Sequence, residues 1–135
     1  MSELNVVDLL RALQVMEKKI SVALMYSGLR IPQFRLLEYL DNHDSATVTE
    51  ISSAMGVTRA TISVMTNELI RSSVLITEDN PTDRRSFHLR LTELGRNKLN
   101  VARSDMAVMR KKISRNYSEE TLKQLNAFAR QVLGQ

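Results

Sequence analysis

The sequence contains no cysteine, so neither a disulfide nor a thiol-based redox switch can operate within it. It has no apolar run long enough to cross a bilayer, and its first residues lack a basic segment followed by an apolar one. We therefore expect a soluble protein of the cytoplasm that has no membrane partner.

Residue patterns typical of enzymes and metal sites are also missing. The two histidines, His43 and His88, are far apart and have no partner at metal-ligand spacing. The chain has no glycine-rich phosphate loop, no nucleophile elbow and no catalytic pair of carboxylates. We therefore expect no metal, no cofactor, no catalytic residues and no enzymatic activity.

What the chain does contain is a modest core and an excess of positive charge. Its 135 residues, of which 43% are hydrophobic, are enough for one domain. The net charge of +4 suits a polyanionic partner, but the 19 basic residues are spread from Arg11 to Arg130. Charge alone therefore does not identify the partner.

Helix signals in the middle of the chain predict two helices joined by a tight turn. Thr47 is followed three residues later by a glutamate, which is the spacing of a capping box, so a helix should begin at Val48. Gly56 can adopt the left-handed conformation that ends a helix, and Thr58 offers a new N-cap. A second helix should then run over residues 59–72. This arrangement is typical of a helix-turn-helix, whose second helix can enter a DNA major groove.

The second helix has two distinct faces. Ile62, Met65 and Leu69 recur at helical spacing and should face the core. The opposite face is short, polar and almost uncharged at its centre, which suits hydrogen bonding and methyl contact with base edges. It consists of Arg59, Ala60, Ser63, Val64 and Asn67. The alternative interpretation is an ordinary solvated helix face.

Two strand-like runs follow, over residues 74–78 and 86–91. The second run alternates, with an apolar face made of Phe87, Leu89 and Leu91. The turn-rich segment between the runs predicts a hairpin, and its tip carries Arg84 and Arg85, one of which Asp83 should hold in place. An arginine at such a tip can contact a phosphate or enter a narrow minor groove.

The terminal segments carry more apolar surface than a chain this small can bury. Apolar residues between Leu4 and Leu24 cover too much of a helix circumference for burial against one neighbour. Apolar stripes also run over residues 99–113 and 122–133, the latter after a cap at Ser118. We expect a homodimer here, the alternative being a monomeric helical extension. A basic run nearby should be a solvated face: Arg103, Arg110, Lys111, Lys112 and Arg115.

Three stretches of this sequence resemble the MarR family of transcriptional regulators. They are residues 28–40 (GLRIPQFRLLEYL), 47–69 (TVTEISSAMGVTRATISVMTNEL) and 80–95 (NPTDRRSFHLRLTELG). The wing pattern followed by Leu91-Thr92-x-x-Gly95 is the most specific of the three. The chain departs from the family pattern at Val64, where similar proteins often have arginine, and at Arg30, where serine or threonine is usual.

The resemblance implies a mainly α fold with a small β-wing. It implies a winged helix-turn-helix over residues 30–92, flanked by dimerisation helices over 1–29 and 93–135. It also implies a dimeric repressor of nearby genes that binds double-stranded DNA at a near-palindromic operator. The DNA-binding residues would be Thr58, Arg59, Ala60, Thr61, Ser63, Val64, Asn67, Asp83, Arg84 and Arg85.

Similar proteins bind small, often aromatic, anions between the DNA-binding and dimerisation parts. Residues that could line such an effector site here are Met16, Met25, Tyr26, Arg30 and Phe34, although a cluster of this kind is more often plain core.

A second class of function stays open. The apolar Val64 and the nearly neutral centre of the second helix would also suit a winged-helix module that binds protein.

Overall fold

The computed structural model describes residues 2–80, 82 and 86–135. Its fold is mainly α with a small two-stranded antiparallel sheet, as the sequence predicts. In chain order the elements are α1 (Val6–Ala23), the 3-10 helix η1 (Met25–Ser27), α2 (Ile31–His43), α3 (Val48–Met55), α4 (Arg59–Arg71), β1 (Leu75–Asp79), β2 (Phe87–Leu91), α5 (Glu93–Asn116) and α6 (Glu119–Val132).

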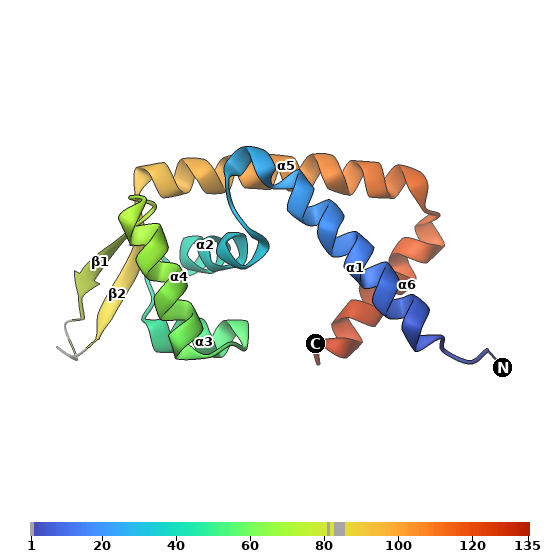
Figure 1. Cartoon of the computed structure of the whole chain (residues 1–135), viewed down its shortest axis with the longest axis horizontal. Helices are drawn as coiled ribbons and strands as arrows, with labels where there is room; N and C mark the ends of the chain where they lie inside the picture. The colour runs from blue at the N-terminus through green and yellow to red at the C-terminus, as the bar shows by residue number, and fades with distance from the viewer. Residues whose placement is uncertain (1, 81, 83–85) are drawn as a thin grey trace.

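Helix α5 runs along the length of the molecule and joins two groups of elements (Figure 1). At one of its ends lie α2, α3, α4 and the hairpin, and at the other lie α1 and α6 together with both chain termini. With 24 residues, α5 is about 36 Å long at 1.5 Å per residue. Within the described residues, no helix has both the length and the apolar character that crossing a bilayer requires.

Side-chain caps set the helix boundaries around the turn, as predicted. The Oγ1 atom of Thr47 accepts from the backbone N–H three residues later at 3.1 Å, and α3 begins at Val48. Gly56 ends α3 with a left-handed φ of 68°. Thr58 then caps α4, its Oγ1 accepting from the N–H of Thr61 at 3.1 Å. The helix-turn-helix therefore follows from local hydrogen bonds.

The core lies between α2, α4, the hairpin and the adjoining half of α5. Its fully buried side chains include Leu36, Leu37, Leu40, Ile51, Ile62, Val74, Leu75 and Leu99. The predicted inner face of α4 is confirmed, because Ile62, Met65 and Leu69 are all buried. This core holds α4 with its opposite face toward solvent.

The hairpin pairs Leu75 with Leu91 and Asp79 with Phe87. Ala46 extends the ladder through two backbone hydrogen bonds with Leu89, of 3.1 and 2.7 Å. Leu89 and Leu91 are buried as predicted, but Phe87 is 53% exposed. Phe87 is exposed because it lies at the outer end of the strand, where the predicted apolar face extends beyond the core. The expected tip residues Asp83, Arg84 and Arg85 lie outside the described residues.

The terminal helices expose their apolar side chains. Neither α1 nor α6, both described in full, contains a buried residue. Their exposed apolar residues include Val6, Val7, Leu10, Leu13, Val15, Val22, Leu125, Phe128 and Val132. A single chain therefore leaves a large apolar surface at the α1–α6 end.

An ionic cluster holds α2 against α5. Asp41 of α2 lies 3.0 Å from the guanidinium of Arg96 and 2.8 Å from that of Arg103. Glu38 adds a second contact to Arg103 at 3.5 Å. The prediction that Arg103 belongs to a solvated basic face was therefore wrong, because two carboxylates distant in sequence approach it.

The start of α5 is joined closely to the start of β1. The N–H of Thr92 donates to the carbonyl of Val74 at 3.1 Å, and its hydroxyl donates to the carbonyl of Ser73 at 2.6 Å. The N–H of Gly95 donates to that hydroxyl oxygen at 3.0 Å. A Cβ atom at Gly95 would collide with the carbonyl oxygen of Val74. This contact explains the threonine and glycine of the Leu-Thr-x-x-Gly motif.

We expect Gly95→Ala to lower the free energy of unfolding by about 1–3 kcal/mol, because the added methyl group meets backbone that cannot move aside. Helix propensity alone would make the alanine variant more stable by about 0.5–1 kcal/mol. A loss of stability can therefore be assigned to the collision. The measurement is urea unfolding, with Asn100→Ala at an exposed position of the same helix as control. Unchanged or raised stability of Gly95→Ala would contradict the close contact.

Candidate nucleic-acid interface

The outward face of α4 is exposed along its length. At about 100° per residue, Ala60, Val64 and Asn67 lie opposite the buried stripe. All three are exposed, and Val64 retains 62% of its accessible surface. We call these three residues the crest of α4. A helix that presents such a crest, with its other side buried, can insert the crest into a groove of a partner.

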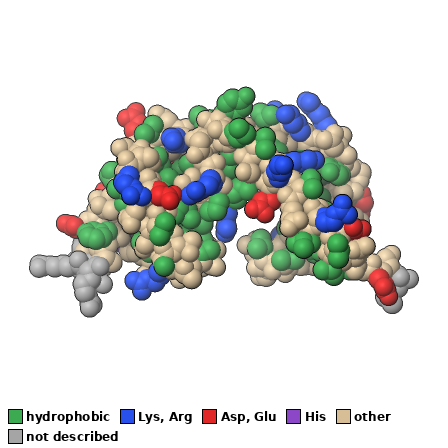
Figure 2. Space-filling model, viewed as in Figure 1, with side chains coloured by type: hydrophobic (Ala, Val, Ile, Leu, Met, Phe, Trp, Pro, Cys, Tyr) green, Lys and Arg blue, Asp and Glu red, His purple; other side chains and the backbone are tan. Residues whose placement is uncertain are grey.

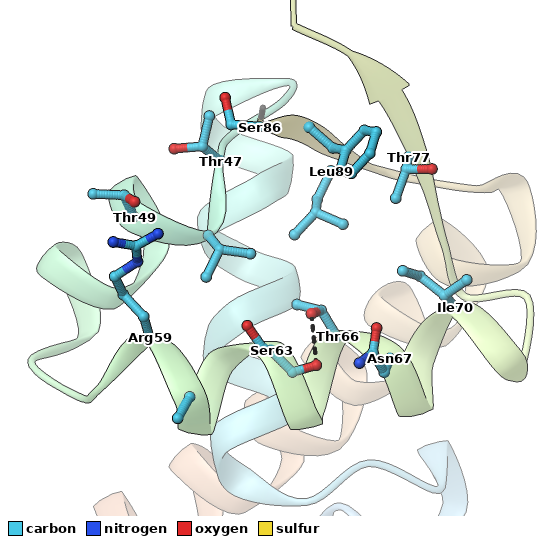
Figure 3. A pocket seen from close by; sticks show the side chains of 13 residues that line it. Thr47, Thr49, Arg59, Ser63, Thr66, Asn67, Ile70, Thr77, Ser86 and Leu89 are labelled. Atoms are coloured by element: carbon cyan, nitrogen blue, oxygen red, sulfur yellow. Dashed lines mark hydrogen bonds between the residues drawn. The ribbon is translucent and has the colours of Figure 1, made fainter. Parts of the chain in front are cut away.

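On one side of the crest, α4 faces α3 and the hairpin across a cavity of about 610 Å³, which we call the wing-side groove. Figure 3 shows Arg59, Ser63 and Asn67 rising from α4 into this space. The residues that line it are Thr47, Val48, Thr49, Arg59, Ala60, Ser63, Thr66, Asn67, Ile70, Thr77, Ser86, Phe87 and Leu89.

The wing-side groove is rich in hydroxyl groups. Thr47 already caps α3, and Thr66 donates to the carbonyl of Ser63 at 3.1 Å. Among the described residues, the hydroxyls of Thr49 and Thr77 make no hydrogen bond with another group of the protein. Among the described residues that line the groove, Arg59 carries the one formal charge, and it is positive. Hydroxyl, amide and guanidinium groups together suit phosphate oxygens and base edges.

On the other side of the crest lies a shallower cavity of about 460 Å³, the α2-side groove. Its lining comes from Arg30 and Pro32 of the α2 start and from Ala60, Thr61, Val64, Met65 and Glu68 of α4. The guanidinium of Arg30 lies 3.0 Å from the carboxylate of Glu68. The side chain of Gln33 accepts from the backbone N–H of Arg30 at 3.0 Å, so one half of a capping box is kept without a hydroxyl.

The structure brings the predicted DNA-binding residues of the helix together on one surface. Thr58 to Asn67 all belong to α4 or to its cap. Asp83, Arg84 and Arg85 lie outside the described residues. Sequence reasoning missed further groove residues, namely Thr49, Thr77, Ser86 and Phe87, because only tertiary packing brings them opposite α4. Thr47 was recognised as a cap but not as part of the groove.

The five suggested effector residues do not gather in one place. Met16 and Tyr26 share a cavity of about 860 Å³ between α1 and α5, which Lys18, Lys19 and Lys112 also line. The other three do not line this cavity: Arg30 is in the α2-side groove, Met25 is 70% exposed, and Phe34 packs against the core.

Each of the two histidine rings lies within hydrogen-bond distance of another group of the protein. His43 Nδ1 lies 2.7 Å from the carbonyl of Tyr39, and His88 Nδ1 lies 3.0 Å from the hydroxyl of Ser45. Over residues 2–80, 82 and 86–135 no group of three or more metal-ligating side chains comes together.

Comparison with known proteins gives one family match and many structural ones. Residues 27–86 match the model of the MarR family. None of the curated proteins matches the chain. The predicted resemblance to this family is therefore confirmed in the segment that holds α2, α3, α4 and β1.

Solved structures extend the likeness to nearly the whole chain. A mutant of E. coli MarR complexed with operator DNA has a TM-score of 0.82 at 19% identity, covering 98% of this chain and 99% of that one. A mutant of S. aureus MepR bound to an oligodeoxyribonucleotide has a TM-score of 0.66 at 24% identity, covering 98% of each. A further MarR family transcription regulator has a TM-score of 0.81 at 21% identity, covering 91% and 82%. At these identities the likeness concerns the fold.

We expect Thr58→Ala to lower the free energy of unfolding by about 1 kcal/mol, because it removes the acceptor for the N–H of Thr61 at the start of α4. Thr58→Ser keeps that acceptor and should restore most of the loss. Urea unfolding of both variants checks the cap. Equal stabilities of the two variants would show that the hydroxyl does not hold the helix start.

Proposed function

We propose that this chain, whose residues 27–86 match the model of the MarR family, is a dimeric, sequence-specific DNA-binding transcriptional regulator that represses neighbouring genes. One observation carries the proposal: the crest of α4 is exposed between two grooves, with polar and basic side chains facing it. E. coli MarR and S. aureus MepR share this fold and bind DNA in their solved structures. We assign the chain to the cytoplasm, as a regulator and not an enzyme.

The crest would read bases in the major groove. Asn67 and Ser63 can donate to and accept from base edges, while the methyl groups of Val64 can meet a thymine methyl. Threonine hydroxyls of the wing-side groove would contact phosphates and hold the register of α4. Arg84 and Arg85, at the predicted hairpin tip, would contact a phosphate or the minor groove.

A second copy would cover the apolar side chains that α1 and α6 expose. A two-fold dimer presents two recognition helices about one DNA turn, or 34 Å, apart and therefore reads a near-palindrome. Because α5 connects the hairpin to the α1–α6 end, its position would set that spacing (Figure 1). A small aromatic or anionic effector would relieve repression only if it binds one spacing more tightly than the other.

One observation favours a second candidate function, a winged-helix module that binds protein. Val64 exposes 62% of its surface at the centre of the crest, as an apolar protein contact would require. The two functions differ in their response to salt. Phosphate contacts weaken steeply as salt rises, whereas an apolar interface scarcely responds.

We expect Asn67→Ala to change base preference at one position of each half-site, with a loss of about 1–3 kcal/mol in discrimination. Replacing Arg84 and Arg85 by alanine should instead weaken binding to all sequences alike. Selection from random duplexes, followed by affinities for single-base variants, measures both effects. Asn100→Ala, at an exposed asparagine of α5, is the matched control. If Asn67→Ala keeps the preference of the unmodified chain, the assigned reading surface is wrong.

We expect Leu125→Glu combined with Phe128→Glu to convert the dimer into a monomer, because both side chains belong to the exposed apolar surface of α6. Neither residue is buried within its own chain, so the monomer should stay folded. Sedimentation velocity gives the oligomeric state, and circular dichroism gives the helix content. Gln131→Glu adds the same kind of charge at an exposed polar position of α6 and should leave the dimer intact. A dimer that survives the double substitution would place the interface elsewhere.

A further inference from the structure

Arg30 is the N-cap residue that precedes α2, but its side chain lies beside α4. The Nη2 atom of Arg30 is 3.0 Å from Oε2 of Glu68, which is 38 positions away. The same groove contains Val64 of the crest. A guanidinium from another helix therefore lies beside the surface of α4 that we propose enters the major groove.

The two sides of the crest differ in chemistry. Arg59 and Ser63 lie on the wing side, where threonine and serine hydroxyls face them across the wing-side groove (Figure 3). Thr61 and Glu68 lie on the α2 side, where Arg30 is the cation among the lining residues. When α4 enters a major groove, a sugar-phosphate strand runs along each side of it. Arg30 is placed to meet the strand on the α2 side.

Two contacts hold Arg30 in this position. Its backbone N–H donates to the side chain of Gln33 at 3.0 Å, and its guanidinium donates to Glu68 at 3.0 Å. Its side chain still exposes 68% of its surface, so further N–H donors of the guanidinium face solvent. The planar arrangement of these donors matches the oxygens of a phosphate. An ion pair this exposed contributes little to stability, so the fold does not require it.

We infer that Arg30 contacts a DNA phosphate on the α2 side of α4, while Glu68 holds the guanidinium there. The inference rests on the proposed function and adds a contact from outside the recognition helix and the wing. Glu68 alone would repel a polyanion, and Arg30 neutralises it. The test must therefore separate a phosphate contact from simple neutralisation of Glu68.

A double variant that combines Arg30→Ala with Glu68→Gln separates a phosphate contact from neutralisation of Glu68. It removes both charges and leaves the net charge unchanged. The probe is a mixed-sequence duplex, since a phosphate contact does not depend on base sequence. Fluorescence anisotropy across a salt series gives the affinity and its slope. We expect affinity to fall about fivefold and the slope of log K against log salt to become shallower by about 0.9 for each bound chain.

The matched control combines Arg11→Ala with Asp8→Asn, which removes an exposed pair of opposite charges from α1 at the other end of the molecule and also leaves the net charge unchanged. It should leave the slope unchanged. If the double variant keeps the affinity and slope of the unmodified chain, Arg30 only neutralises Glu68 and the inference is overturned. Equal losses for the two double variants would overturn it as well, since the loss would then not depend on the position of Arg30.

Failure of the inference and failure of the proposed function give different results. Salt-sensitive binding by the unmodified chain together with unaffected Arg30 variants contradicts the phosphate contact alone. A chain that binds no duplex at any salt concentration contradicts the proposed function and the inference together.

Discussion

The close contact between Gly95 of α5 and the carbonyl of Val74 is the constraint on which the rest of the structure depends. Val74 lies between α4 and β1, while β2 leads into α5, so the contact closes a loop that contains the whole hairpin. Thr92 supports the contact with hydrogen bonds to Ser73 and Val74. Farther along α5, Asp41 joins α2 to Arg96 and Arg103. The elements that we propose read DNA are thus attached to α5 at two places and should move with it.

This attachment gives α4 its exposed position. Because the inner face of α4 lies in the core, the crest is left exposed between the wing-side groove and the α2-side groove (Figures 1 and 3). On the face drawn in Figure 2, basic side chains are spread over both ends of the molecule with acidic ones among them, and they do not gather into a single block. Placement of a few side chains therefore matters more than net charge. The two positions where the chain departs from the family pattern, 30 and 64, lie in the same groove.

Local patterns predicted the elements that depend on local hydrogen bonds and on burial periodicity. Thr47, Gly56 and Thr58 set the turn, and the 3.6-residue repeat identified the buried side of α4. Contacts between distant residues were beyond such reasoning. The pairs Arg30–Glu68 and Asp41–Arg103 join residues 38 and 62 positions apart, and no spacing rule predicts them. Alternation placed Phe87 on the inner face but could not show where the core ends. Apolar composition likewise could not show which residues share a cavity. The five predicted effector residues therefore do not all line one cavity in the structure.

The measurement that tests the central claim most directly is the affinity of the unmodified chain for the intergenic duplex upstream of its own gene. Fluorescence anisotropy across a salt series, with mixed-sequence duplex as competitor, gives affinity, salt dependence and specificity together. A regulator of the proposed kind binds this duplex tightly, loses affinity steeply as salt rises, and keeps its preference in the presence of competitor. Equally weak binding to both duplexes, without a response to salt, would contradict sequence-specific DNA binding and favour the protein-binding module.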